Sequence, residues 1–439
     1  MTNCTSNLIE FSPLNRKKVV GNFNGGSITS DAGLLLLREV DKKLNLTARL
    51  SKVMRDDRAA GMVDHTMLDM LRQRVYALAA GYEDINDHQV LREDVCFQTA
   101  VSRERLLASP PTLSRFENAL DRESMFKMSE ILVEHFIERQ ITAPNELILD
   151  FDPTDHRLHG HQDKRHYHGY YEEYCYLPLH VFCGDHLLVS YLRPSDIDGA
   201  KHAGVILRWL VNRFKKVWPN VKITFRGDSA FARKRILHWC ECNNITYIVG
   251  LSGNARLYKM VEALEKQAEE QYKKTQIKQR LFFDGQYQAG TWKIARRVVA
   301  KLEHHDQGSN RRFIVTNQAA EIPAENVYDH DYCPRGEMEN KIKQLKLDLS
   351  SDRNSCSDFL ANQFRVLISS IAYILITELQ YQCLSETELK KSYCGTIRLK
   401  LFKIGAIILK NTRRIQILFS SYYPYQATFN IAARNLVPT

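Results

Sequence analysis

The sequence predicts an α/β protein in which a mixed β-sheet core follows a mainly helical N-terminal domain. Apolar residues recur at helical spacing through residues 1–140, and after Pro144 the pattern changes to short strand-like runs. These runs come first in hairpin order and then alternate with helices, which describes a mixed sheet with helices packed on it. Because 439 residues are too many for one compact core, we expect two or three domains.

The N-terminal region, residues 1–140, carries three predicted helices after an irregular start. The first helix contains AGLLLLREVDKKL, and either Ser30 or Asp31 can cap it. The second helix begins near His65 and the third near Thr112. The Gly-rich segment before the first helix lacks the Lys-Ser/Thr of a phosphate-binding loop, so nucleotide binding is not expected there.

Strands and helices alternate through the first part of the core, residues 141–254. ELILDFDPT (146–154) is typical of a strand that ends at a proline. YLPLHVFCG and HLLVSYLRP form a predicted hairpin that turns at Gly184 and Asp185. A helix, the strand VKITFRGD, a second helix and the strand ITYIVGL then follow in that order.

Residues 255–330 interrupt this scheme, and we interpret them as a β-rich insertion. A charged helix over about 257–275 precedes the strand-like runs QRLFFDGQYQ, TWKIARRVVAKLE and RRFIVTN. Residues 331–439 then complete the core and form a C-terminal helical region. The longest apolar run there, VLISSIAYILIT, has 12 residues and contains two serines, so it predicts a buried helix and no membrane span.

The charge and the cysteine content of the chain indicate what kind of partner it binds and in which compartment it is found. The formal net charge is +10, and such a basic excess favours binding to a polyanion. The ten cysteines include no CxxC pair, and the first residues show no apolar signal segment after their charges. We therefore expect reduced thiols and a cytoplasmic protein.

The stretch YCPRGEMENKIKQLK (332–346) sets two glutamates among basic side chains on a predicted helix over about 334–349. Its apolar stripe consists of Met338, Ile342, Leu345 and Leu349. One flank of that stripe collects Arg335, Glu339, Lys343 and Lys346. On the other flank Glu337 and Lys341 can pair as solvated surface, so the carboxylate in the basic flank, Glu339, is the candidate for chemistry.

Two aspartates stand at the ends of predicted strands. The strand period of two places Asp150 and Asp152 on one face, and Asp152 lies where a proline stops the ladder. Asp228 ends VKITFRGD, where a lone aspartate would more often cap the next helix. Together with Glu339 they form a set of carboxylates that repel one another unless cations neutralise them. Two Mg²⁺ or Mn²⁺ ions, about 3.5–4 Å apart, could do so and clamp the oxygens of a phosphoryl displacement.

These motifs resemble those of bacterial insertion-sequence transposases of the DDE type. Tyr332, Arg335, Glu339 and Lys346 have the spacing of that group's Y-(2)-R-(3)-E-(6)-K signature, and LDFDPTD and FRGDSAFA are similar to its two aspartate motifs. More narrowly, the chain resembles the 1380 family of insertion sequences over about residues 20–435. The stretches that carry this likeness are TSDAGLLLLREVD, DHTMLDMLRQRVYALAAGYEDINDH, LASPPTLSRFENAL and RLKLFKIGA.

The resemblance implies a ribonuclease-H-like core with a β-rich insertion, and a DNA-binding role for residues 1–140. It implies that Asp152, Asp228 and Glu339 are the catalytic residues and ligands of two metal ions. Asp150 and Asp155 are alternatives for the first acid, although the D-x-T context and the strand-end position favour Asp152. The expected DNA-binding side chains are Tyr332, Arg335, Lys343, Lys346, Arg296, Arg297 and Trp292.

Two of these expectations have alternatives. Trp292 could stack on a flipped base, as the resemblance suggests, but packing in the core of the insertion is favoured. The five histidines of HRLHGHQDKRHYHGYY (156–171) lack the spacing of a zinc motif, so a DNA-facing aromatic and basic loop is preferred over a metal site.

The expected function is therefore DNA transposition. Metal-activated water would cut at the inverted-repeat ends of the element, and the freed 3′-hydroxyl would attack target DNA. The resemblance implies a homodimer that acts at the bacterial nucleoid, with no membrane partner. Two rival functions fit the same scaffold: a catalytically silent DNA-binding regulator, and a structure-specific nuclease that cuts without joining.

Overall fold

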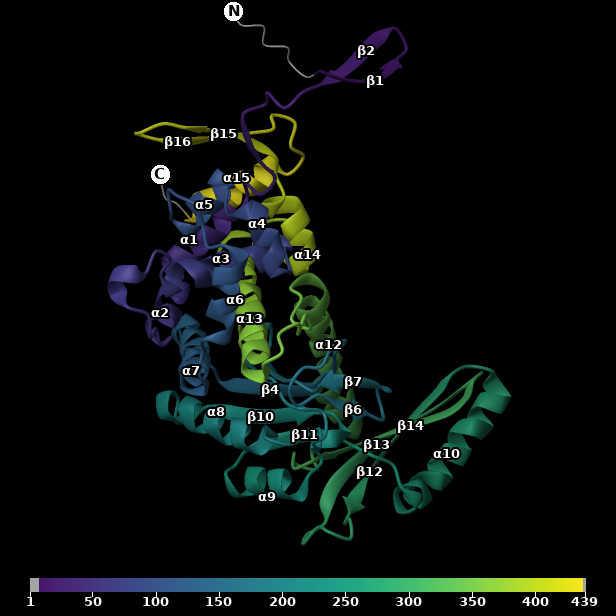
Figure 1. Cartoon of the computed structure of the whole chain (residues 1–439). Coiled ribbons are helices and arrows are strands. Elements are labelled where there is room, and N and C mark those ends of the chain that lie inside the picture. Colours follow the sequence, from purple (N-terminus) through teal and green to yellow (C-terminus); the bar gives the residue numbers. More distant parts are fainter. Residues whose placement is uncertain (1–7, 437–439) are drawn as a thin grey trace, which may run out of the picture. The chain divides into compact units, whose positions relative to one another are not determined.

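The computed structural model describes residues 8–436, which form two compact units (Figure 1). The first unit contains the described residues up to Ser51, Asp56–Phe116 and those from Leu375 onward. The second contains Lys52–Arg55 and Glu117–Ile374. The predicted boundaries at 140, 254 and 330 divide the chain along its sequence, whereas the first unit joins segments from both halves of the chain.

The second unit is built on an eight-stranded mixed sheet, as the predicted fold class requires. Its strand order is β12-β13-β14-β11-β10-β4-β8-β9. The strands are β4 (Glu146–Pro153), β8 (Leu179–Cys183), β9 (His186–Tyr191), β10 (Lys222–Gly227), β11 (Thr246–Leu251), β12 (Gln279–Tyr287), β13 (Arg296–His305) and β14 (Gly308–Thr316). Strand β10 is parallel to β4 and to β11, and the other neighbours are antiparallel.

The two faces of this sheet have different roles because side chains alternate along each strand. On one face Leu149, Phe151 and Phe225 are buried in the main core, where the rings of Phe151 and Phe225 lie 5.0 Å apart. That core is shared with the helices α7 (Arg122–Arg139), α8 (Ala203–Val217), α9 (Lys234–Cys242) and α10 (Ala255–Thr275). The opposite face of β4 carries Asp150 and Asp152, as the strand period predicted.

The segment predicted as an insertion, residues 255–330, has the helix and the three strands expected, but the strands form no separate sheet. Strand β14 pairs with β11, so β12, β13 and β14 continue the main sheet beyond the parallel strands. Helix α10 packs along β12 and β13, and Figure 1 shows it beside them. The insertion therefore shares its hydrophobic core with the rest of the unit.

Residues 324–348, which follow the sheet, are helical throughout, but the type of helix changes along the segment. It comprises α11 (Ala324–Asn326), a π-helical turn over Val327–Tyr332, a 3₁₀ turn over Cys333–Arg335, α12 (Gly336–Lys343) and a second π-helical turn over Gln344–Asp348. Val327 and Tyr328 are buried against Ile248 of β11. This contact places the start of α12 on the sheet face that carries the aspartates.

Helix α13 (Phe359–Cys383) is long and apolar enough to cross a membrane, the one such helix among the described residues. Within its most apolar 18-residue window, 89% of the residues are buried inside the protein. It is therefore a core helix, as its sequence predicted.

The first unit contains a hairpin, a small sheet and short helices. Its strands are β1 (Ile9–Leu14) and β2 (Lys17–Gly21), which form the hairpin, and β3 (Ser27–Thr29), β15 (Ala406–Lys410) and β16 (Ile415–Phe419), which form a sheet of order β16-β15-β3. Its helices are α1 (Leu34–Leu44), α2 (Leu46–Lys52), α3 (Met67–Ala80), α4 (His88–Leu91), α5 (Val95–Val101), α6 (Pro110–Asn118), α14 (Cys394–Ile397) and α15 (Gln426–Leu436). Pairing of β3 with β15 joins segments almost 380 residues apart in the chain.

The prediction that Ser30 or Asp31 caps the first helix is wrong. Helix α1 begins after Gly33 without a side-chain cap. Asp31 is buried instead, where it accepts hydrogen bonds from Ser30 and Tyr82 and pairs with Lys403 at 2.7 Å. A Cβ atom on Gly33 would lie 1.6 Å from the carbonyl oxygen of Leu401, so only glycine fits this close approach.

Deleting the β1–β2 hairpin, Ile9–Gly21, is expected to leave the stability of the remaining protein almost unchanged. All of its residues are exposed except Gly21, which is half-buried, and a two-stranded hairpin has little stability of its own. The expected change in melting temperature is no more than about 2 °C, measured by differential scanning calorimetry. A fall of more than about 5 °C would show that the hairpin stabilises the unit.

Candidate active site

The two candidate aspartates lie at the same edge of the sheet because β4 and β10 are parallel neighbours. Asp152 is the penultimate residue of β4, and Asp228 directly follows β10. Gly227 is in register with Phe151, so the two carboxylates leave adjacent strands at the same level. Ligand sites commonly form at the carboxyl ends of parallel strands.

Arg335 connects the first aspartate to the glutamate of α12. Its Nη1 lies 3.5 Å from Oδ2 of Asp152, and its Nη2 lies 3.4 Å from Oε1 of Glu339. Because the guanidinium is a rigid fork, these two carboxylate oxygens are no more than about 9 Å apart. The side chains of Asp152 and Arg335 are mostly buried, whereas that of Glu339 is 56% exposed.

The acids carry more negative charge than this single arginine can neutralise. Burial raises the pKa of Asp152 to about 7; Arg335 opposes the rise, and the charges of Asp228 and Glu339 add to it. Burial also raises the pKa of Asp228, against a hydrogen bond from the backbone N–H of Ala230. Unneutralised carboxylates of this kind suit a hard divalent cation with oxygen ligands.

The donor set therefore fits Mg²⁺ or Mn²⁺, while the present arrangement is not a closed metal site. Among residues 8–436, no group of three or more acidic, histidine or cysteine side chains stands close enough to hold an ion. Arg335 lies between Asp152 and Glu339 and supplies the positive charge there.

The two alternatives for the first acid have other partners. Both oxygens of Asp150 accept hydrogen bonds from the guanidinium of Arg226, with Nη2 at 2.8 Å from Oδ2. Arg226 also donates to the backbone carbonyl of Asp331 at 2.6 Å. Asp155 is bonded to Lys346, whose Nζ lies 2.8 Å from its backbone carbonyl. In this arrangement Asp152 is the acid that contacts Arg335.

The remaining residues of the predicted signature lie around the acids. Tyr332 is partly buried, and its hydroxyl would be 2.9 Å from a Cβ atom on Gly250 of β11. The charge of Asp228 adds to the burial that raises the pKa of Tyr332, which indicates that the two side chains are neighbours. Lys346 is held by Asp155, whereas Lys343 is exposed and has no hydrogen-bond or ion-pair partner among the described residues.

The apolar stripe of the predicted helix is confirmed, and its opposite flank is corrected. Met338, Ile342, Leu345 and Leu349 are all buried. Lys341, expected to pair with Glu337 as solvated surface, is buried as well. It donates to the carbonyl of Gly184 at 2.7 Å and pairs with Asp185 at 3.1 Å, which fixes α12 to the β8–β9 turn.

The structure does not place the predicted DNA-binding side chains of the insertion on a surface. The Arg296 guanidinium pairs with Glu241 at 2.6 Å and lies 4.8 Å from the centre of the Trp292 ring. Arg297 pairs with Asp284 at 2.6 Å and donates to two backbone carbonyls. All three side chains are buried. Arg296 and Arg297 pair with carboxylates inside the unit, and Trp292 packs in its hydrophobic core, as the favoured alternative predicted.

The histidine-rich loop forms a small sheet that the sequence did not predict. Its strands are β5 (His156–Arg157), β6 (His166–His168) and β7 (Glu173–Tyr176), in the order β5-β7-β6. His156 is buried and contacts the Asn354 amide at 3.0 Å. The strands have two to four residues, too short for an alternating pattern to be recognised.

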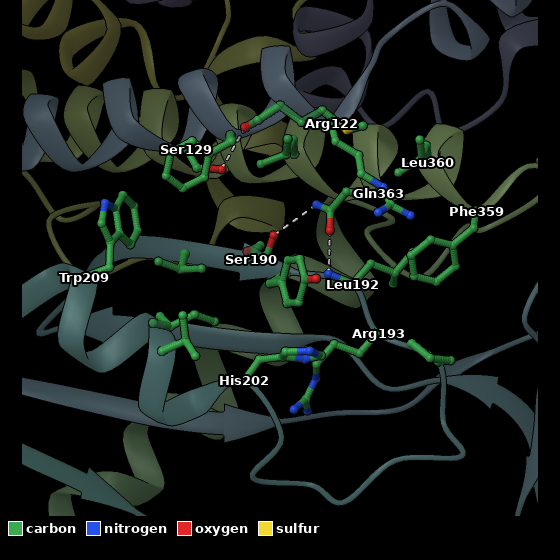
Figure 2. Close-up of a pocket in the computed structure, with 18 of the residues that line it drawn as sticks. Arg122, Ser129, Ser190, Leu192, Arg193, His202, Trp209, Phe359, Leu360 and Gln363 are labelled. Atoms are coloured by element: carbon green, nitrogen blue, oxygen red, sulfur yellow. Dashed lines mark hydrogen bonds between the residues drawn. The ribbon is translucent and has the colours of Figure 1, made fainter. Parts of the chain in front are cut away.

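A separate cavity of about 430 Å³ lies in the same unit and is mainly apolar (Figure 2). It is lined by residues of α7, α8, β9 and α13, including Met125, Phe126, Trp209 and Leu367. Gln363, which lines it, accepts from the Leu192 N–H at 2.6 Å and donates to the Ser190 carbonyl at 3.1 Å. None of the predicted site residues lines it.

The pKa of Asp152 predicts a pH-dependent stability in metal-free buffer. Its folded pKa of about 7 lies above the ordinary 3.8, so between these values the folded state binds more protons than the unfolded state. Stability is therefore lost as the pH rises through this window. Asp152→Asn removes the charge and is expected to unfold in urea with a free energy higher by on the order of 3 kcal/mol at pH 8.

This gain should shrink as the pH falls towards 4. Glu337→Gln, which removes an exposed carboxylate from the far flank of α12, is the matched control and should show no such dependence. Equal stability of Asp152→Asn and the parent protein at pH 8 would contradict the assignment of a buried, uncompensated charge.

Comparison with known proteins shows the family of the chain. A family model described as transposase DDE domain group 1 matches residues 11–439. Among curated proteins, none matches the sequence. Among solved structures, the chain is similar to the piggyBac transposase in a synaptic complex with hairpin DNA, with 12% identity and a TM-score of 0.42. That alignment covers 85% of this chain and 80% of the other.

Proposed function

Because the chain belongs to the transposase DDE domain group 1 family, we propose that it cuts DNA at the inverted-repeat ends of a mobile element and joins the freed 3′-hydroxyls to target DNA. One observation carries the proposal. Asp152 and Asp228 leave adjacent parallel strands at one sheet edge, and Arg335 links Asp152 to Glu339. This arrangement supports the proposal, because phosphoryl-transfer chemistry uses acids that hold metal ions.

A ribonuclease-H-like core is part of this proposal. Its support is the order of the central strands: β9, β8 and β4 are antiparallel neighbours, and β10 and β11 follow in parallel to β4. The stretches of residues 29–120 and 398–406 quoted above favour the 1380 family of insertion sequences within the wider group.

Asp152, Asp228 and Glu339 would hold two Mg²⁺ or Mn²⁺ ions, which when bound activate the attacking oxygen and stabilise the leaving one. Asp152 must be ionised for this role, although burial raises its pKa to about 7. Arg335 keeps part of that charge neutralised in the absence of DNA. Once the acids have another cation, its guanidinium is free to bind a phosphate, a geometry that the arginine fork suits.

The other signature side chains would position the DNA. Exposed Lys343 can bind a backbone phosphate without breaking an internal contact. Lys346 would have to exchange its bond with Asp155 for a phosphate. Tyr332 packs between the sheet and Arg335, whose guanidinium carbon lies 6.0 Å from the ring centre, so its role is to orient that arginine. A homodimer would bring two element ends together at the bacterial nucleoid.

A strand-transfer assay tests the function. The full chain is incubated with Mg²⁺ or Mn²⁺, a DNA carrying the element's inverted repeat, and a supercoiled target plasmid. A transposase gives 3′-hydroxyl cleavage at the repeat and covalent joining to the plasmid. A silent regulator binds the repeat and gives neither product with either ion, and a structure-specific nuclease gives cleavage without joining.

A further inference from the structure

A pair of exposed tyrosines stands on the small sheet that follows the first candidate acid. Tyr167 of β6 and Tyr174 of β7 are directly opposite each other, with ring centres 5.7 Å apart at 73°. They are 58% and 46% exposed, so neither is part of the core. The Arg165 guanidinium lies over the Tyr174 ring at 4.8 Å and adds a positive charge to the same face.

The turn between β6 and β7 carries further aromatic rings. Tyr170 is 83% exposed, and its ring centre lies 5.0 Å from that of Tyr171. The ring centre of His168 lies 4.9 Å from that of Tyr171. We call Tyr167, Tyr170 and Tyr174 the tyrosine platform.

The platform is attached to the catalytic edge of the main sheet. Strand β5 begins at His156, directly after Asp155, whose side chain is held by Lys346 of the signature. Burial is the main cause of the raised pKa of Tyr171, and the negative charges of Asp155 and Asp152 raise it further. The small sheet that bears the platform therefore begins next in the chain to the segment that carries the first candidate acid.

Internal hydrogen bonds hold the platform in place. The Tyr176 hydroxyl donates to the carbonyl of Asp163 at 2.6 Å, and the Asp163 N–H donates to the carbonyl of Ser357 at 2.9 Å. Ser195 donates to the carbonyl of His166 at 2.9 Å. Rings that are exposed but rigidly supported are preorganised to bind a flat ligand, because little conformational entropy is lost when they do so.

We infer that the tyrosine platform stacks on unpaired bases beside the scissile phosphate, an inference that rests on the proposed function. Aromatic rings that stand out from a basic surface bind single strands through their base faces. In a duplex these faces are covered by neighbouring base pairs, and they become accessible where a strand end is frayed or cut. The guanidinium of Arg165 and the ammonium group of Lys164 can bind the adjoining phosphates.

The test compares single-stranded and duplex DNA binding in EDTA, where no cleavage occurs. The probes are fluorescein-labelled (dT)₁₂ and a blunt duplex of the same length. Replacing both ring-paired tyrosines, Tyr167→Ala with Tyr174→Ala, is expected to weaken binding of the single strand by about tenfold or more. The corresponding double replacement by Phe keeps the rings and should bind the single strand as tightly as the parent protein does. Both double variants should bind the duplex with the affinity of the parent protein.

Two further variants keep the test decisive. Tyr422→Ala removes a tyrosine that is 96% exposed in the first unit and should change neither affinity. Tyr170→Ala alters the turn without touching the paired strands, and it should weaken single-strand binding even if the double variant misfolds. Unchanged single-strand affinity in both the Tyr167→Ala, Tyr174→Ala double variant and the Tyr170→Ala variant, or an equal loss of duplex affinity, would overturn the inference.

Failure of the inference and failure of the proposed function give different results. If the platform does not stack, strand transfer by the parent protein still occurs, and the Ala variants bind the single strand as tightly as the parent protein does. If the proposed function is wrong, strand transfer is absent whatever the binding measurements show.

Discussion

Asp228→Asn is expected to lower the rate of strand cleavage by at least about 1,000-fold, because it removes a charge that the metal ions need as a ligand. Asparagine is the most informative replacement at this position, because it separates the effect of the charge from that of the local structure. The Oδ1 atom of Asp228 accepts the Ala230 N–H at 2.9 Å and caps the turn Ser229–Phe231, and an asparagine oxygen can accept the same bond. The variant therefore loses the charge and keeps the local structure.

DNA binding should survive this replacement, since removal of a negative charge beside the phosphates cannot weaken the electrostatic attraction. Cleavage is measured by the release of a labelled 3′ end, and binding by gel shift with the same DNA. Asp121→Asn is the matched control, because Asp121 also caps a helix, α7, by accepting the Ser124 N–H at 2.8 Å, but its side chain is 41% exposed. Cleavage by Asp228→Asn within tenfold of the parent rate would remove Asp228 from the catalytic set.

The parts of the fold that could be predicted from the sequence are those with a strong local pattern. The stripe of Met338 and Ile342 predicted the buried side of α12, and alternation in ELILDFDPT predicted that Asp150 and Asp152 share a face. Strand-end positions also indicated that Asp152 and Asp228 would lie at one edge of the sheet, because parallel strands end at one edge. These signals depend on neighbouring residues and need no knowledge of the tertiary structure.

The features of the fold that the sequence did not predict depend on contacts between residues that are distant in the sequence. Lys341 looks like a surface residue on its helix but is buried by the turn at Gly184. Arg296 carries a charge that suits DNA, yet Glu241 from α9 neutralises it inside the unit. The continuation of the main sheet by β14 likewise needs a pairing that no local pattern encodes. In each case a long-range contact decides whether a charged or strand-like segment is exposed.

The two aspartates on one face of β4 show most clearly what the structure adds to the sequence. They have the same residue type, the same face and almost the same position, so a sequence pattern hardly distinguishes their roles. The structure gives Asp150 a buried guanidinium, that of Arg226, and gives Asp152 a position beside Arg335 and Asp228. We therefore expect one to be structural and the other catalytic, and the two can be separated by measurement.

Asp150→Ala is expected to lower the free energy of unfolding by about 3–5 kcal/mol, because it leaves the buried guanidinium of Arg226 without its counter-charge. Urea unfolding in metal-free buffer at pH 8 measures the loss, and Asp152→Asn, expected to be stabilising there, is the matched control. Replacing both partners by apolar residues, Asp150→Leu with Arg226→Met, should recover most of the loss, since no charge is then left buried. A loss below about 1 kcal/mol for Asp150→Ala would contradict a structural role and return Asp150 to the candidates for the first acid.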